Sequence, residues 1–161
     1  MGIRMTTKLS EVHDMLMREA ERVERLTIRA LSKLGEQCVT KIRDRAGDKS
    51  WYDQTGNLRS SVGYVIAHNK NIIQYSTFNQ VNQGSEGVKT GKDLAKELAK
   101  RYSNNYVLIV VAGMNYAEFV EAMDNKDVLA SAELWARGKW PEVERKLKTK
   151  IEEEIDKLEI F

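Results

Sequence analysis

A turn and the start of a strand meet in the segment Asp53-Gln54-Thr55-Gly56-Asn57-Leu58-Arg59-Ser60-Ser61-Val62. Thr55-Gly56-Asn57 is typical of a turn, because glycine tolerates positive φ and an asparagine side chain can bond the backbone two residues on. After the turn, every second position suits one buried face of a strand: Leu58, Ser60, Val62, Tyr64 and Ile66. This alternation places Arg59, Ser61, Gly63 and Val65 on the opposite face.

A second strand follows after a short polar break. His68-Asn69-Lys70-Asn71 interrupts the alternation, and the segment from Ile72 to Phe78 is rich in the β-branched and aromatic residues that strands prefer. The pattern predicts a β-hairpin from Arg59 to about Phe78. In this hairpin Leu58 would anchor the strand in the core. Arg59 would either bond a carboxylate or a backbone carbonyl at a junction, or remain an exposed strand charge.

Length and composition are those of one globular domain. The chain has 161 residues, of which 42% are hydrophobic, enough for a sizeable core in a single domain that spans 1–161. Charged residues make up 31%, but the formal net charge is only +2, which argues against an electrostatic nucleic-acid binder. The longest apolar run, Tyr106 to Met114, is shorter than the roughly 20 residues that a membrane span needs. The single cysteine, Cys38, excludes an internal disulfide and is expected as a small apolar residue on a helix.

The first third of the chain predicts one long amphipathic helix from Leu9 to about Ile42. Apolar and small residues recur at spacings of three and four: Leu9, Val12, Leu16, Ala20, Val23, Ala30, Leu31, Leu34, Cys38 and Ile42. A glycine inside it, Gly35, is a weak point where the helix could kink. Two interpretations of its apolar stripe stay open: a helix that covers its own core, or a helix that packs against a neighbouring subunit.

The middle of the chain predicts a loop, a helix and a strand. Residues 79–90 are polar and contain glycine, which predicts a mobile loop. The run from Gly87 to Asp93 is similar to a phosphate-binding loop, but its spacing is one residue short and Asp93 replaces the required hydroxyl. A short helix from Asp93 to Tyr102 follows. The run from Tyr106 to Ala112 predicts a central strand that is buried on both faces.

The last third of the chain predicts a second long helix. Tyr116 to Met123 fits a helical turn or an irregular edge, and Val128 to Ala132 fits another short strand. Pro141, the only proline, suits the first turn of the final helix. That helix has a clear apolar stripe: Val143, Leu147, Ile151, Ile155 and Leu158. The predicted fold class is therefore α+β, with long N- and C-terminal helices packed on a small, mainly antiparallel sheet.

Residues that carry catalysis or bind metals are not grouped in this sequence. Its two histidines, His13 and His68, have no Cys, His or paired carboxylate at ligand spacing, so no metal site is predicted. No strained nucleophile motif such as G-x-S-x-G occurs. Asp53 and Glu121 could pair as acid and base, but a turn-forming Asp and a surface or interface Glu explain them equally simply. We therefore predict no catalytic residue and no cofactor, and do not expect an enzyme.

Two segments resemble a family of viral assembly proteins. The residues Asp53 to Val62 are similar to the D-x-T-G-x-L-R-x-S-[VI] signature of tailed-bacteriophage tail-completion proteins, which join head and tail. The segment Tyr116-Ala117-Glu118-Phe119-Val120-Glu121 is similar to the family's Y-A-x-[YF]-[VQ]-E segment. The order of long helix, motif, hairpin, strand, Y-A segment and C-terminal helix also agrees. Two departures are Ala122-Met123, where the family has a glycine, and the lack of proline between Lys126 and Ala132. Residues 79–105 also look like a longer central insertion relative to the family.

The resemblance implies a structural virion protein that assembles with copies of itself into a ring. Such a ring would lie in the neck of the particle, contact head-completion and tail-tube proteins, and leave a channel through which DNA only passes. It would be assembled in the cytoplasm of a bacterial host and need no membrane. The resemblance marks these motif and interface candidates: Asp53, Thr55, Gly56, Leu58, Arg59, Ser61, Tyr116, Phe119, Val120 and Glu121.

Two other classes of function stay open. The chain could be a non-viral helical adaptor or binding module that recruits a partner through its N-terminal helix. An enzyme is the third class, and it would require a deep pocket with perturbed titrating groups.

Overall fold

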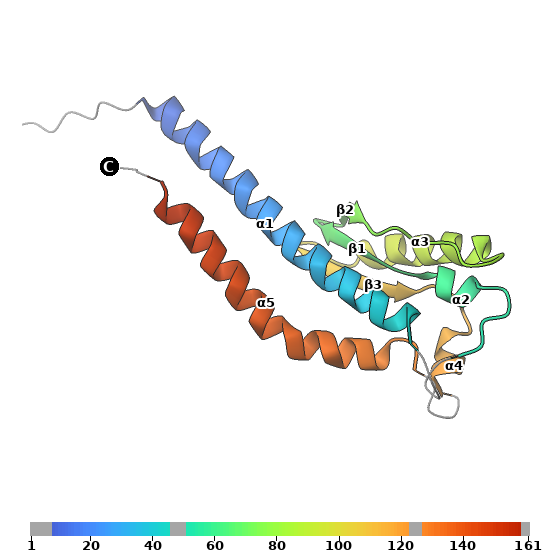
Figure 1. Ribbon diagram of the computed structural model, residues 1–161. Coiled ribbons are helices and arrows are strands. Elements are labelled where there is room, and N and C mark those ends of the chain that lie inside the picture. The colour runs from blue at the N-terminus through green and yellow to red at the C-terminus, as the bar shows by residue number, and fades with distance from the viewer. Residues whose placement is uncertain (1–7, 46–50, 123–126, 159–161) are drawn as a thin grey trace, which may run out of the picture.

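The computed structural model describes residues 8–45, 51–122 and 127–158. It confirms the predicted α+β class, with long terminal helices and a small antiparallel sheet (Figure 1). The elements in chain order are α1 (Leu9–Arg43), α2 (Asn57–Ser60), β1 (Val62–His68), β2 (Asn71–Tyr75), α3 (Ser85–Ala99), β3 (Val107–Ala112), α4 (Ala117–Ala122) and α5 (Ala130–Asp156).

Helix α1 has the length that its apolar spacing predicts. Its 35 residues correspond to a rod of about 50 Å at 1.5 Å per residue. The C-terminal half supplies the buried positions Leu31, Leu34, Cys38, Val39 and Ile42. The helix continues through Gly35, the weak point at which the sequence allowed a kink. Gly35 instead lies against the ring of Tyr64, because a Cβ at this position would come within 2.7 Å of two ring carbons.

The sheet has the order β2-β1-β3, with both pairs antiparallel. Strand β1 is central and is buried from Val62 to Ala67. The prediction that Tyr106 to Ala112 forms the central strand is therefore wrong, because β3 lies at an edge. Its apolar character has another cause: α1 packs against one face of this edge strand and α3 against the other. Residues on both faces of β3 are thereby partly or fully buried.

The predicted hairpin exists, but it begins at Val62 rather than Arg59. Asn69 (φ 50°) and Lys70 (φ 65°) form its two-residue turn, and positive φ at both positions matches the right-handed twist of the strands. Leu58 and Ser60 were predicted on the strand, but they belong to the single helical turn α2. The backbone N–H of Ser60 donates to the Gly56 carbonyl (2.9 Å), and that of Ser61 to the Asn57 carbonyl (2.9 Å).

Helix α3 begins eight residues before the predicted helix, so the predicted loop at 79–90 is wrong from Ser85 onward. The residues Gly87 and Gly91 favoured a loop because glycine is a poor helix former. Both are buried where α3 crosses α2 and the start of β1. A Cβ on Gly87 would lie 1.9 Å from the Asn57 carbonyl oxygen, and one on Gly91 would lie 2.4 Å from that of Ser61. The close approach of helix and backbone therefore requires these glycines.

Helix α5 also begins earlier than predicted. It includes Ala130 to Ala132, which were predicted as part of a strand, and Pro141 lies inside the helix rather than in its first turn. Proline lacks the N–H that would bond the carbonyl four residues back, and its ring crowds that carbonyl. Helix α5 bends in its N-terminal half (Figure 1), and the internal Pro141 is the physical cause that the sequence offers for this bend.

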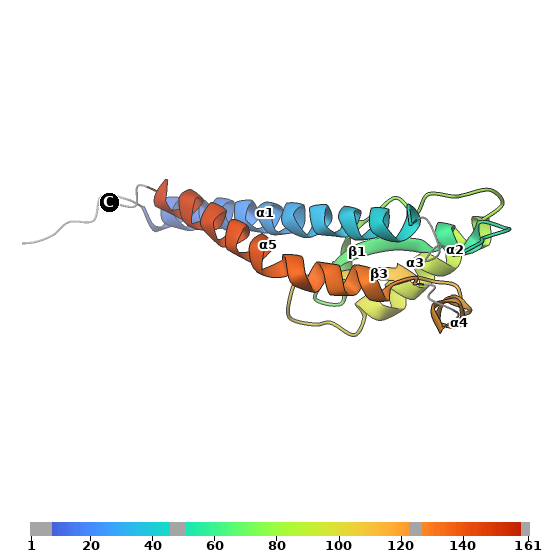
Figure 2. The ribbon, with the colours of Figure 1, turned by 60° about the horizontal axis from the view of Figure 1, so that its bottom comes forward.

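The elements form three layers. The sheet lies between α3 on one face and α1 on the other, and α5 packs along α1 (Figure 2). Alternate residues of β1 divide between two apolar clusters: Val62, Tyr64 and Ile66 face α1, whereas Val65 and Ala67 face α3. The sheet and α3 cover only the C-terminal half of α1, so the N-terminal end of α1 and the C-terminal end of α5 extend together beyond them as a two-helix arm (Figures 1 and 2).

Candidate functional site

The candidate site is the place where the two family-like segments fold together, which we call the motif junction. It comprises residues 53–61 and 116–121 with the backbone that they bond. Its first part is organised by Asp53, whose Oδ2 accepts a hydrogen bond from the backbone N–H of Arg59 (2.7 Å). This N–H is the third of the helical turn α2, a group that helix geometry leaves without a partner. Asp53 therefore caps α2 from a distance.

Gly56 allows the turn that leads into α2. Its φ is +77°, a conformation that side chains other than that of glycine rarely adopt. A Cβ at this position would also lie 2.0 Å from the carbonyl oxygen of Val81. Glycine is thus required at this position both by its positive φ and by the nearby backbone carbonyl of Val81.

The guanidinium of Arg59 ties the motif to the end of α1. It donates to the backbone carbonyls of Arg43 and Trp51, the latter at 3.1 Å, and it lies 4.8 Å from the centre of the Trp51 ring. The Arg43 carbonyl is one of the last in α1, where helical partners are missing. Of the roles considered for Arg59, the structure shows carbonyl bonding, and these carbonyls belong to its own chain.

Two buried hydroxyls fasten the motif to its neighbours. Ser60 Oγ accepts the backbone N–H of Val81 (2.8 Å). Ser61 Oγ accepts the N–H of Gly113 (3.0 Å) and donates to the Leu58 carbonyl (2.8 Å). Neither serine is exposed to solvent, so these bonds compensate the cost of burying polar groups. Leu58 itself is 1% exposed and packs in the core cluster on the α1 side, so it is buried as predicted, although from α2.

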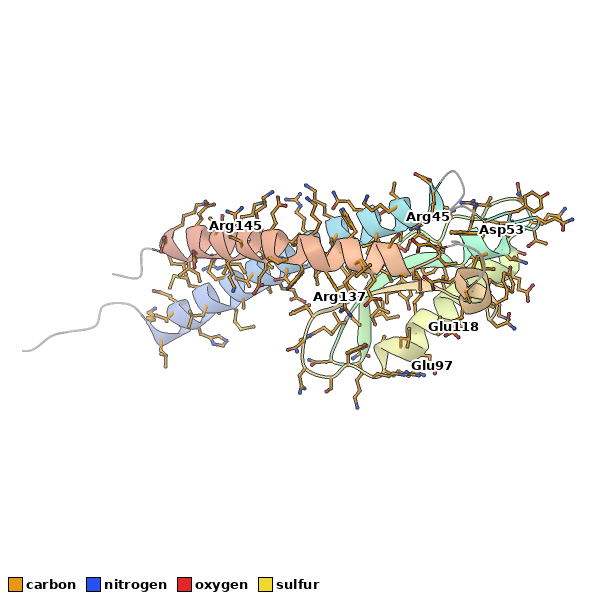
Figure 3. All side chains as sticks on the ribbon, turned by 90° about the horizontal axis from the view of Figure 1, so that it is seen from below. Arg45, Asp53, Glu97, Glu118, Arg137 and Arg145 are labelled. Carbon is orange, nitrogen blue, oxygen red and sulfur yellow. The ribbon has the colours of Figure 1, made fainter. Side chains whose placement is uncertain are left out.

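The second family-like segment lies against the first. Burial raises the pKa of the Tyr116 phenol, the nearby carboxylates of Asp53 and Glu86 raise it further, and a hydrogen bond with Thr55 opposes them. Tyr116 therefore lies beside Asp53 and Thr55, which are more than 60 residues away in the chain. Figure 3 shows Asp53 and Glu118 at the same end of the molecule, opposite the arm that carries Arg145.

Helix α4, which belongs to the motif junction, contacts the start of α5 through Glu121. Oε1 of Glu121 accepts the backbone N–H groups of Leu129 (3.0 Å) and Ala130 (2.6 Å). Val120 is half-buried against the same core cluster as Leu58. Phe119 belongs to α4, but its side chain lies outside the described residues. Glu121 and Asp53 thus each accept backbone N–H groups at the start of a different helix.

Most motif side chains therefore bond or pack within their own chain, and only a few face solvent. Thr55 is exposed, Tyr116 is 36% exposed and the adjacent Tyr52 is 91% exposed. Together with the exposed Gln54 and Glu118, they are side chains at or beside the motif junction that a neighbouring molecule could contact. The sequence pattern did not predict the hydrogen bond from the Gly87 N–H to Asn57 Oδ1 (3.0 Å) or the role of Ser60. A paired glycine spacing, Gly87 and Gly91, was the available signal for a close helix contact.

The described residues offer little reactive chemistry. They contain no cluster of three or more His, Cys, Asp or Glu that could hold a metal ion. Burial raises the pKa of the Cys38 thiol, although Lys41 acts in the opposite direction, and a raised pKa disfavours the reactive thiolate. His68 stacks on Tyr106 with ring centres 4.1 Å apart. Among the residues that the structure describes, no helix combines the length and hydrophobicity that a bilayer crossing requires.

Comparisons with protein-family models, with curated proteins and with solved structures found no match for this chain.

Proposed function

We propose that this chain is a structural protein of a tailed bacteriophage, which forms a ring at the junction of head and tail. The observation that carries the proposal is the motif junction. The two segments that resemble tail-completion proteins fold against one another, with Tyr116 beside Asp53 and Thr55. Two matching segments that form one structural unit support the resemblance more strongly than two unconnected segments would.

The shape of the molecule also suits assembly. The arm exposes large apolar side chains, since Leu9 is 77%, Leu16 is 53% and Met17 is 52% exposed. Apolar residues grouped on a projecting surface are typical of sites that contact another protein. In a ring, such surfaces would pack against neighbouring copies, and the function would lie in geometry rather than in catalysis.

Quantitative mass spectrometry of purified virions, scaled to the portal protein, tests the proposal. A copy number comparable with that of one ring is the expected result. Hundreds of copies per particle would instead indicate a tube or capsid component. Absence of the chain from virions would contradict a structural role in the particle.

The exposed arm also favours a second candidate function, a helical adaptor that recruits one foreign partner. An adaptor needs no contact between its own copies. A chain that stays monomeric at high concentration and binds its partner in a one-to-one complex would therefore favour the adaptor over the ring.

A further inference from the structure

A basic groove runs between the two long helices on one side of the arm base. It has a volume of about 470 Å³ and is lined by α1 from Leu26 to Gln37 and by α5 from Lys139 to Lys150. Its charged lining consists of five cations and one carboxylate: Arg29, Lys33, Lys139, Lys146, Lys150 and Glu142. This is a strong local excess in a chain whose total net charge is +2.

Three cations of the groove are available to a partner. Glu142 pairs with Lys146 (2.6 Å) and Lys139 (3.4 Å). Arg29, Lys33 and Lys150 are exposed and form no ion pair with a described residue. The groove therefore has uncompensated positive charge on both of its walls, since Arg29 and Lys33 belong to α1 and Lys150 to α5.

The floor of the groove is apolar. The side chains that line it between the cations are Leu26, Ala30, Leu34, Val143 and Leu147. Nucleic-acid phosphates gain nothing from such a floor, because their affinity for proteins comes from charge. An acidic protein surface that also carries apolar side chains can use both the walls and the floor, in the way that amphipathic helices dock into grooves.

The far end of the same arm has that chemistry. The segments 8–18 and 151–158 contain six carboxylates and three cations (Lys8, Arg18 and Lys157). Five of the carboxylates are exposed and form no ion pair with a described residue: Glu11, Asp14, Glu152, Glu153 and Asp156. Exposed apolar side chains lie among them, since Leu9, Leu16 and Ile155 are 77%, 53% and 49% exposed. We call this surface the acidic tip.

We infer that the basic groove is a docking site for the acidic tip of a second copy of this chain. The two surfaces are complementary in charge, and each adds apolar side chains to the contact. They are different surfaces of one molecule, so the contact is head-to-tail, and repeating it produces a closed ring or an open filament. The inference rests on the proposed ring function and supplies the contact that would build it.

Charge reversal on each surface tests the contact in the full-length chain. The groove variant carries Arg29→Glu and Lys33→Glu, and the tip variant carries Glu152→Lys and Asp156→Lys. A matched control, Lys89→Glu with Lys100→Glu, reverses two exposed cations of α3 and its C-terminal end outside the groove. Circular dichroism melting first establishes that every variant is folded, and mass photometry then measures assembly at 50 mM and 500 mM NaCl.

The wild type and the control variant are expected to assemble at low salt and to assemble less at high salt. Each reversed variant alone is expected to lose assembly, with the apparent dissociation constant raised at least about tenfold. An equimolar mixture of the groove and tip variants is expected to assemble again, because each reversed surface then meets its complement on the other variant.

Three outcomes would overturn the inference. Reversed variants that assemble like the wild type would leave the ring proposal intact and remove this contact from it. A mixture that stays unassembled would show that the two surfaces do not meet. If the wild type binds a DNA duplex and the groove variant does not, while assembly is unchanged, the groove would be assigned to nucleic acid. Conversely, rescued assembly into open filaments would support the contact and contradict the ring.

Discussion

Small residues at and beside the motif junction are required by close packing as much as by hydrogen bonds. Gly56, Gly87 and Gly91 each lie where a Cβ would collide with a backbone carbonyl group. Ser60 and Ser61 are fully buried and bond the backbone of distant segments. Small residues of this kind leave a weak signal in a sequence, because a turn, a loop and a close contact all favour them.

Gly35 and Gly138 allow a matched test of this idea, because both lie inside long helices. Ala at either position gains about 1 kcal/mol of helix propensity. At Gly138 an added Cβ meets no described atom within 4 Å, whereas at Gly35 it meets the buried Tyr64 ring at 2.7 Å. We expect Gly138→Ala to stabilise the protein by up to about 1 kcal/mol and Gly35→Ala to destabilise it by about 1–3 kcal/mol.

Urea unfolding of the two variants and the wild type measures this difference. An equal stabilisation by both substitutions would show that α1 and the sheet do not approach as closely as described.

Asp127 makes the stability of the protein depend on pH in the acid range. Burial acts to raise the pKa of its carboxyl group, but the side-chain and backbone hydrogen bonds of Ser131 and the neighbouring Arg45 outweigh burial and lower it. A lowered folded-state pKa means that the unfolded chain binds protons more readily. The contribution of Asp127 to stability is therefore present above its ordinary pKa of about 3.9 and is lost as pH falls through the folded-state value.

We expect the free energy of unfolding of Asp127→Asn to fall less steeply than that of the wild type below about pH 4. Asparagine keeps the ability to cap the Ser131 N–H, so the comparison isolates the charge. Parallel curves for the two proteins between pH 5 and pH 2 would contradict a stabilising ion pair between Asp127 and Arg45.

At the scale of whole elements, periodicity predicted the long helices well and short elements poorly. Helix α1 differs from its prediction by one residue at its C-terminal end, because its apolar spacing repeats over ten positions. The period of two from Leu58 to Ile66 contained only four residues before Val62, and one helical turn capped by Asp53 replaced them. A single turn gives too few repeats to distinguish period 2 from period 3.6.

Interactions between residues that are distant in sequence explain most of the other differences between prediction and structure. Strand β3 has the composition of a central strand, but the order of strands depends on pairing that no local pattern encodes. Pro141 is accepted within α5 although proline disfavours helix interiors. In the motif junction, the residues were predicted but their contacts were not, since Tyr116 and Thr55 meet only after the chain has folded.

Glu121 offers a test of how α4 and α5 are connected. It accepts two backbone N–H groups at the start of α5, so Glu121→Ala should destabilise the protein by about 1 kcal/mol, as loss of a helix cap does. Glu118→Ala is the control, because Glu118 is an exposed carboxylate on the same short helix, and surface changes of this kind stay within about 0.5 kcal/mol. Thermal unfolding of both variants gives the answer, and equal effects would remove the capping role from Glu121.

At the scale of the whole molecule, the chain consists of a layered body and a projecting arm. The body contains both apolar clusters and the motif junction, and the arm carries exposed apolar side chains with opposite charges at its base and tip. Within the arm, an ion pair between Arg22 of α1 and Glu154 of α5 (2.8 Å) joins the two helices. Such a shape gives a subunit two separate surfaces, which is what head-to-tail assembly requires.

The central claim is that copies of this chain form a closed ring, and native mass spectrometry of the purified full-length protein tests it most directly. Negative-stain electron microscopy of the same sample would show whether the assemblies are closed. The account predicts one dominant oligomer with a fixed number of subunits and a ring-shaped image with a central opening. A monomer that persists to high micromolar concentration at low salt would contradict it.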